Sequence, residues 1–187
     1  MDFEILETNR LILKGLTPVH MKYVFENYTK KEIKILLGHR SEEDYQKEEY
    51  KFKNGYASYN RSFMLFLLTD KGSNKIFGRC GLHNWNKEHS RAEIGYSIDI
   101  EQFKRKGLMS EALEVIIAYG FDKLKLNRIE ALVGKDNIPS LKLMEKYDFM
   151  HEGILRNHYY LNDKYIDSIM FSILRKDYYF IINNLSE

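Results

Sequence analysis

The chain has 187 residues, of which 44% are hydrophobic and 30% are charged, and this composition suits one folded domain with a buried core. It excludes an intrinsically disordered chain, because such chains combine low hydrophobicity with a high net charge. The 29 lysines and arginines nearly balance the 27 aspartates and glutamates, so the net charge of +2 does not indicate bulk attraction to nucleic acid. We expect a single domain over residues 1–187.

The N-terminal third predicts one strand followed by helices. Residues 10–16 alternate as in a strand. Thr17 and Pro18 then have the pattern of a helix N-cap and a first helical residue. Ser41 and Asp44 have the spacing of a capping box, which predicts a second helix.

The middle of the chain is rich in predicted strands. Two apolar runs, 62–69 and 75–85, flank the turn 70–74 and predict a hairpin. Residues 91–100 predict a further strand. Apolar residues at helical spacing then predict a helix from about Leu108 to Leu124.

The C-terminal third adds a strand, a helix and a hairpin. The strand is expected over 128–133 and the helix over 139–146. Residues 151–161 and 165–174 predict two strands turned at Asn162-Asp163. Strands and helices mix without strict βαβ alternation, so the fold class is α/β (α+β), a mixed sheet flanked by helices.

The N-terminus and the cysteine content predict a cytoplasmic protein. Cys80 is the single cysteine, so no internal disulfide forms, which fits a reducing compartment. Residues 1–8 carry three acids and no apolar run like that of a signal peptide. No stretch approaches the roughly 18 apolar residues that span a membrane. We therefore expect no membrane partner.

Several common motifs are missing. The sequence contains no Walker A loop, no GxGxxG and no GxSxG elbow. Its six histidines show no HExxH spacing, so we expect no metal site. Cys80 alternates within a predicted strand, which favours a packed core thiol over a nucleophile.

One segment has the pattern of a phosphate site. A predicted strand, 91–99, is followed by the basic turn 104–106 and by Gly107, which opens a helix. Free N–H groups and a partial positive charge at a helix N-terminus bind phosphate, and glycine lets a ligand approach the backbone closely. The alternative is a solvated basic loop before a surface helix, and this segment alone leaves both open.

The same segment resembles the pyrophosphate-binding motif of the GCN5-related N-acetyltransferases (GNAT), Gln/Arg-x-x-Gly-x-Gly/Ala. Gly107 matches its first glycine, whereas Lys104 and Met109 depart at the other two positions. Other segments resemble the ribosomal-protein alanine acetyltransferase branch of that family, the RimJ/RimL type, in the same order along the chain. These segments are 7–13, 92–96, 136–140, Phe149, 152–153 and 160–163.

The resemblance implies a mostly antiparallel sheet that splits between its fourth and fifth strands, with acetyl-CoA as cosubstrate in the split. The backbone of Ser97 to Asp99 would pair with the pantetheine arm, and N–H groups of Arg105 to Ser110 would hold the pyrophosphate. The cofactor-binding residues implied in this way are Ser97, Ile98, Asp99, Lys104, Arg105, Lys106, Gly107, Leu108, Met109, Ser110 and Asn137.

The resemblance also implies two catalytic residues. Glu93 stands where several family members carry a carboxylate general base, and an alkylammonium must lose a proton before it attacks a thioester. Ser140 matches a serine that serves the leaving thiolate. The alternatives are, for Glu93, a strand glutamate in an ion pair or facing solvent and, for Asn137 and Ser140, a helix cap. Met144 stands where many relatives carry a tyrosine general acid.

The sequence thus predicts an N-acetyltransferase that moves an acetyl group from acetyl-CoA to a primary amine, such as a protein N-terminal α-amine, by direct transfer in a ternary complex. The alternatives are a small amine (polyamine, amino acid or antibiotic) as acceptor, or a CoA-binding protein without catalysis. A nucleic-acid-binding role for the basic turn is disfavoured by the near-neutral charge. Whether the chain forms a homodimer stays open.

Overall fold

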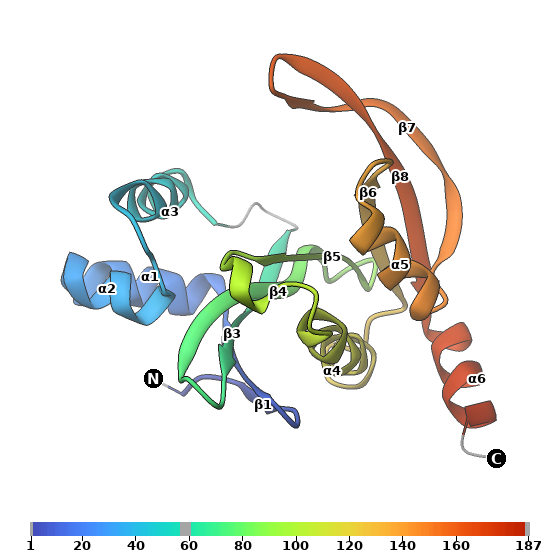
Figure 1. Cartoon of the computed structure of the whole chain (residues 1–187), viewed down its shortest axis with the longest axis horizontal. Helices are drawn as coiled ribbons and strands as arrows, with labels where there is room; N and C mark the ends of the chain where they lie inside the picture. Colours follow the sequence, from blue (N-terminus) through green and yellow to red (C-terminus); the bar gives the residue numbers. More distant parts are fainter. Residues whose placement is uncertain (1, 57–60, 186–187) are drawn as a thin grey trace.

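The computed structural model describes residues 2–56 and 61–185 (Figure 1). In this part of the chain one eight-stranded sheet runs in the order β1-β2-β3-β4-β5-β6-β8-β7. The strands are β1 (Ile5–Glu7), β2 (Leu11–Leu16), β3 (Ser62–Asp70), β4 (Lys75–Asn86), β5 (Arg91–Ile98), β6 (Arg128–Gly134), β7 (Met150–Leu161) and β8 (Lys164–Leu174). The helices are α1 (Pro18–Asn27), α2 (Lys30–Leu37), α3 (Glu42–Asn54), α4 (Leu108–Asp122), α5 (Ile138–Lys146) and α6 (Arg175–Leu185), with a short 3-10 helix η1 (Glu101–Phe103).

The sheet topology confirms the expected fold class. All neighbouring strands in the described chain are antiparallel except β5 and β6, which are parallel. That pair corresponds to the predicted fourth and fifth strands, because the sequence analysis did not foresee the three-residue β1. The helices α2 and α6 were not foreseen either. None of the helices in residues 2–56 and 61–185 is long and apolar enough to cross a bilayer.

Capping boxes start the first three helices. The predicted starts are confirmed: Thr17 caps α1 and Ser41 caps α3, each accepting a hydrogen bond from a backbone N–H three residues on. Thr29 and Glu32 form the same arrangement at the start of α2. Gly38 ends α2 in a left-handed conformation.

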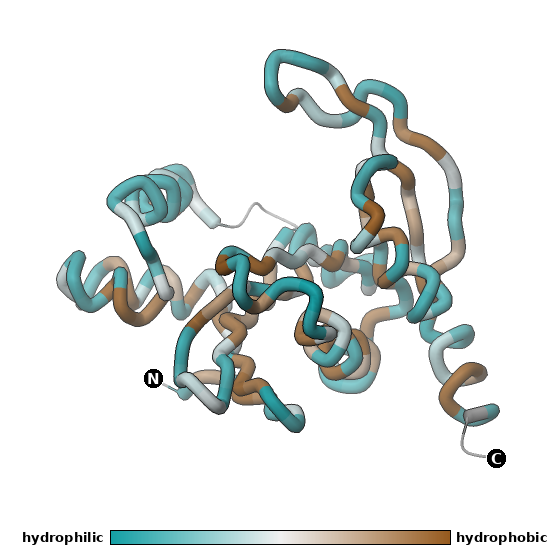
Figure 2. The backbone as a smooth tube through the Cα atoms, in the orientation of Figure 1, coloured by the Kyte–Doolittle hydropathy of each residue, from teal (hydrophilic) through white to brown (hydrophobic). Residues whose placement is uncertain are grey.

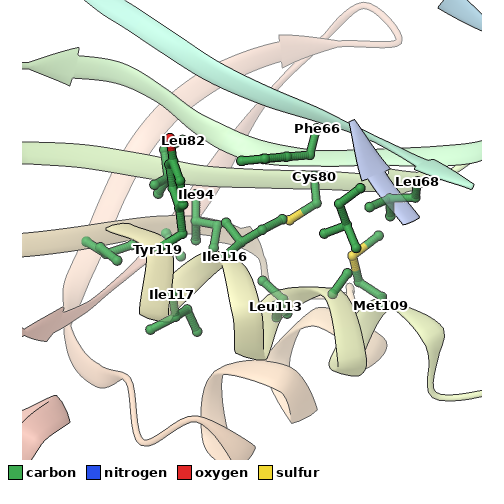
Figure 3. Close-up of a cluster of buried hydrophobic side chains, with 14 of the residues drawn as sticks. Phe66, Leu68, Cys80, Leu82, Ile94, Met109, Leu113, Ile116, Ile117 and Tyr119 are labelled. Carbon is green, nitrogen blue, oxygen red and sulfur yellow. The ribbon is translucent and has the colours of Figure 1, made fainter. Parts of the chain in front are cut away.

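Helix α4 packs on one face of the sheet and forms the main core. Its buried face meets inward side chains of β3, β4 and β5 (Figure 3). Cys80 is fully buried there beside the α4 side chains, and burial raises the pKa of its thiol. The prediction of a packed core cysteine is therefore confirmed.

Helices α1 to α3 cover the opposite face of the sheet. Their smaller core includes Met21, Val24 and Ile33, which pack against Leu16 and Leu67 of the sheet. Figure 2 shows that α3 is hydrophilic along most of its length, in contrast to α4. Helix α3 accordingly buries only Tyr45 and Glu48, whereas α4 buries nine residues.

The β7–β8 hairpin rises away from the rest of the sheet (Figure 1). Its turn residues Asn162 and Asp163 both have positive φ angles, 50° and 59°, as a two-residue type I′ hairpin turn requires. The predicted turn is confirmed. Tyr160 and Tyr165 near the tip are exposed, with their ring centroids 4.9 Å apart.

Candidate active site

A cleft opens where β5 and β6 separate. The two strands pair only through Arg91–Glu93 and Arg128–Glu130 and then diverge. A cavity of about 580 Å³ lies beside the free edge of β5. Nine of the predicted cofactor-binding residues line it: Ser97, Ile98, Lys104, Arg105, Gly107, Leu108, Met109, Ser110 and Asn137. Ser140 also lines it, whereas Asp99 and Lys106 do not.

The backbone of β5 explains why Asp99 lies outside the cleft. The N–H of Asp99 donates to the carbonyl of Phe77 in β4 at 2.9 Å, and the carbonyl of Asp99 accepts from the Arg40 guanidinium. Successive strand residues point their N–H and C=O groups to opposite edges. Ile98 and Tyr96 therefore present theirs to the open edge, where an extended ligand finds free partners.

Helix α4 begins at the cleft without a cap. Gly107 occupies the N-cap position with a φ of 75°, and no side chain caps the first turn. The N–H groups that open a helix need external partners, and the helix dipole adds positive potential there. Leu108, Met109 and Ser110, which make up this first turn, line the cavity. The arrangement suits an anion such as a pyrophosphate.

The turn before Gly107 carries three cations. Lys104 makes an ion pair with Glu101 at 2.8 Å, and the Arg105 side chain is 87% exposed. Both line the cavity. Lys106 contributes its backbone carbonyl to Arg10 instead.

At the start of α5, Asn137 and Ser140 form the predicted cap. The side-chain oxygen of Asn137 accepts the backbone N–H of Ser140 at 3.2 Å. The buried phenol oxygen of Tyr96 has no hydrogen-bond partner among the described residues, and the Ser140 hydroxyl lies near it without making one. Burial raises the pKa of the Tyr96 phenol, and the nearby Ser140 opposes the shift. Both residues line the cleft, and the Tyr96 hydroxyl keeps hydrogen-bonding capacity that the described side chains do not use.

Glu93 lies on the other face of β5, at the point where pairing with β6 ends. Its side chain is 12% exposed. One carboxylate oxygen accepts from the Asn84 amide at 3.0 Å, and the other lies 3.6 Å from the His83 ring nitrogen. No lysine or arginine of the described chain makes an ion pair with it.

Glu130 sits opposite Glu93 in the strand register and shows the contrast. Arg91 and Arg128 donate to its two oxygens at 3.0 Å and 2.8 Å. Glu130 is therefore a neutralised structural carboxylate. Glu93 keeps a shielded carboxylate without a permanent cation, which suits a group that accepts a proton.

The position on α5 where many relatives carry a tyrosine general acid holds Met144, which has no acidic proton. Met144 is fully buried in the core. The nearby Tyr147 packs at the end of α5, and its hydroxyl hydrogen-bonds to Ser110. Lys146 also donates to the Ser110 hydroxyl at 2.6 Å. The end of α5 thereby braces the first turn of α4.

A second cavity of about 440 Å³ lies between α3 and the sheet, on the Glu93 face of β5. Its walls include Tyr56, Phe63, Leu65, Gly81, His83 and Gly95. A β-carbon at Gly95 would lie 2.7 Å from the His83 ring, so glycine keeps this ring beside the strand. Gly95 and Tyr96 are neighbours on one strand, so β5 separates the two cavities.

Residues 10–150 match the family described as the acetyltransferase (GNAT) domain, which covers most of the chain. The chain belongs to the GNAT acetyltransferase family. It is an acetyl-CoA-dependent N-acetyltransferase, as the sequence resemblance predicted.

Two Bacillus proteins are similar to this acetyltransferase. The uncharacterized N-acetyltransferase p20 of Bacillus licheniformis is 41% identical over 60% of the chain and 63% of its own length. The uncharacterized N-acetyltransferase YoaA of Bacillus subtilis is 32% identical over 92% of the chain and 98% of its own length. The first match thus spans just under two thirds of its relative, and the second spans nearly all of it.

Solved structures share the fold of this acetyltransferase. A ribosomal-protein-S5-alanine acetyltransferase from Vibrio fischeri superposes with a TM-score of 0.67, 22% identity and coverage of 94% of this chain and 98% of the other. A spermidine/spermine N-acetyltransferase from Vibrio cholerae gives 0.67 and 22%, covering 96% and 100%. At this identity they establish the fold, and their named acceptors differ from each other.

Several residues of this acetyltransferase were missed by the sequence analysis. Tyr96 faces the cleft, and His83 and Asn84 contact Glu93. His83 was seen only as a residue without metal-ligand spacing, although its place opposite Glu93 follows from the β4–β5 register. The cavity under α3 had no signal in the sequence, because residues far apart along the chain form it.

Proposed function

We propose that acetyl-CoA binds in the cleft between β5 and β6, and that the acceptor is the α-amine of a peptide N-terminus. The acceptor residue would occupy the cavity under α3, and Glu93 would be the general base. The observation that carries this proposal is the shielded carboxylate of Glu93, on the strand that the two cavities share. The family chemistry requires such a group, since an ammonium has no lone pair to attack with.

The residues of the cleft fit the donor. The uncapped N-terminus of α4 and the side chains of Lys104 and Arg105 suit its phosphates. The open edge at Tyr96 and Ile98 offers N–H and C=O groups to the amides of the pantetheine arm, as a neighbouring strand would. Acetyl-CoA supplies a thioester as the acetyl donor.

The cavity under α3 favours a neutral residue over a polycation. A polyamine needs carboxylates along its length to balance its charges. Among the described residues of this wall one side chain is acidic, that of Glu48, and this residue is 6% exposed. Its carboxylate is already engaged by Lys51 at 3.3 Å, Arg79 at 3.6 Å and the hydroxyl of Tyr56 at 3.0 Å. The apolar part of the wall, which includes Phe63, Met64 and Leu65, supports a small side chain at the peptide N-terminus. The cations Lys51 and Arg79 in the same wall disfavour a polycation.

The residues then divide the proton transfers between them. Glu93 accepts a proton from the acceptor ammonium, while Asn84 and His83 hold the carboxylate in place. The neutral nitrogen forms the new bond to the acetyl carbon, and the bond from that carbon to sulfur breaks. The nitrogen then gives up a second proton, which the departing sulfur takes, so that the products are the amide and the CoA thiol. The Ser140 hydroxyl donates a hydrogen bond to the departing thiolate. Ser140 takes this role because Met144 has no proton to give.

A thiol-release assay on the full chain tests the proposal. Peptides with Ala, Ser or Met at a free N-terminus are compared with the same peptides blocked by an acetyl group, and with spermidine. We expect thiol release with the free peptides and none with the blocked ones. Faster turnover of spermidine would contradict the peptide acceptor. Binding of acetyl-CoA without turnover of any amine would indicate a CoA-binding protein.

A further inference from the structure

The turn that precedes α4 holds an unfavourable conformation. Arg105 and Gly107 both lie in the left-handed region, with φ angles of 59° and 75°. Arg105 is not a glycine, so its conformation needs support from the surrounding structure. Three neighbouring cations, residues 104–106, also repel one another. Glu101 offsets part of this repulsion through ion pairs with Lys104 at 2.8 Å and Arg105 at 3.6 Å, and further contacts come from outside the turn.

Those contacts come from the start of the chain. Glu111, in the first turns of α4, accepts hydrogen bonds from the Thr8 hydroxyl and from the backbone N–H of Arg10 at 2.8 Å. Its second oxygen accepts from the Arg10 side chain at 2.6 Å. Burial raises the pKa of Glu111, but the hydrogen bonds from Thr8 and Arg10 outweigh this and leave the pKa below its usual value. Glu111 is thus held in its ionised form.

Arg10 reaches the turn itself. While one of its nitrogens binds Glu111, another donates to the backbone carbonyl of Lys106 at 3.0 Å. In a planar trans peptide the carbonyl and the following N–H point in opposite directions. By fixing the carbonyl of Lys106, Arg10 therefore also fixes the direction of the Gly107 N–H. Gly107 lines the cleft.

We propose that Arg10 and Glu111 are positioning residues that lock the Lys106–Gly107 peptide for pyrophosphate binding. The inference rests on the proposed donor site. Neither side chain lines the cleft, so their effect on the donor is indirect. The guanidinium fork is needed because it spans a carboxylate and a carbonyl at once.

The test uses two donors that differ in the group the turn would bind. Acetyl-CoA carries the pyrophosphate, and S-acetylpantetheine lacks it. Arg10→Met keeps the apolar stem and removes every side-chain donor while the backbone N–H remains, and Glu111→Ala removes the carboxylate. We expect each variant to raise the Kd for CoA, measured by calorimetry, about tenfold, since displaced binding groups lose their alignment. kcat/KM with S-acetylpantetheine stays within twofold of the unmodified protein.

Two further variants sharpen the test. Arg10→Met/Glu111→Ala should bind CoA no worse than the weaker single variant, because both changes break one shared interaction. Glu7→Gln is the matched control: Glu7 makes an ion pair with Lys71 at 2.8 Å in the same region without contacting the turn. We expect it to leave both donors unaffected.

The possible results distinguish failure of this inference from failure of the proposed function. Equal losses with both donors would mean general damage to the fold and would overturn the inference, as would an unchanged Kd for CoA in Arg10→Met. In those cases binding of CoA by the unmodified protein still supports the proposed donor site. If the unmodified protein fails to bind CoA, the proposed function and this inference both fall.

Discussion

On the α4 face of β5, Ala92 and Ile94 are buried in the main core, whereas on the other face Glu93 is shielded from solvent and Gly95 lines the cavity under α3 together with His83. The first face is densely packed with apolar side chains, and the second holds a carboxylate and an open cavity. The difference shows how one strand serves two tasks. Dense packing behind β5 fixes the backbone, so that a charged group in front of it keeps its place.

The largest effect is expected at Gly107, in the cleft proposed for the donor acetyl-CoA. Gly107→Glu would place a carboxylate at the uncapped helix N-terminus, where it would occupy the N–H groups and repel phosphate. We expect calorimetry to detect no CoA binding at millimolar concentration, with the protein still folded. The left-handed φ costs about 1 kcal/mol for a residue with a β-carbon.

Gly107→Ala is the control for that strain. It carries the same backbone penalty without the charge, so it should bind CoA more weakly than the unmodified protein but measurably. If Gly107→Glu binds CoA as tightly as Gly107→Ala, the phosphate site lies elsewhere.

The acceptor side is tested at Glu93. We expect Glu93→Gln to lower kcat by about 10²-fold or more while the Kd for CoA stays the same, as for removal of a general base. The loss should shrink at high pH, because more of the acceptor is then neutral without help. The pH–rate profiles of both proteins on one peptide measure this.

Glu130→Gln is the matched control, since Glu130 faces Glu93 across the strand register. It leaves Arg91 and Arg128 without their shared partner, so we expect a lower thermal midpoint and a nearly unchanged kcat. Parallel pH–rate profiles for Glu93→Gln and the unmodified protein, less than about threefold apart, would remove Glu93 from the mechanism.

The smallest expected effect is at Gly95. In Gly95→Ala the new β-carbon would lie 2.7 Å from the His83 ring, which must swing away from Glu93. We expect KM for the peptide to rise a few-fold, roughly 1 kcal/mol or less, because a ring at the end of a side chain moves at modest cost. The Kd for CoA should not change. A rise in that Kd instead would show that the two faces of β5 are coupled.

Much of the fold follows from local signals. The capping residues Thr17 and Ser41 and the turn Asn162-Asp163 predicted their elements, because these patterns act over a few neighbouring residues. The α2 start has the same signal in Thr29 and Glu32 and was within reach. Strand β1 was not, since three residues are too few for a periodicity and its pairing with β2 decides it.

The site likewise contains residues that a local segment predicts and residues that only the folded chain brings together. Residues 97–99 and 104–110 were predicted from the family resemblance of one short segment, and most of them line the cleft. Arg10 and Glu111 were beyond such reasoning, because they stand 101 positions apart and meet only in the folded chain. Asp99 lies within the predicted stretch, yet its backbone bonds to β4 and Arg40, which no sequence spacing reveals.

Cys80 makes the protein convenient to measure. It is the single cysteine of the chain, its side chain is fully buried, and burial raises the pKa of its thiol. A disulfide reagent therefore meets no reactive sulfhydryl on the native enzyme, and the colour developed during turnover reports the product alone. Under partly denaturing conditions the same reagent labels Cys80 only as the core opens. The rate of Cys80 labelling therefore reports the opening of the core during unfolding.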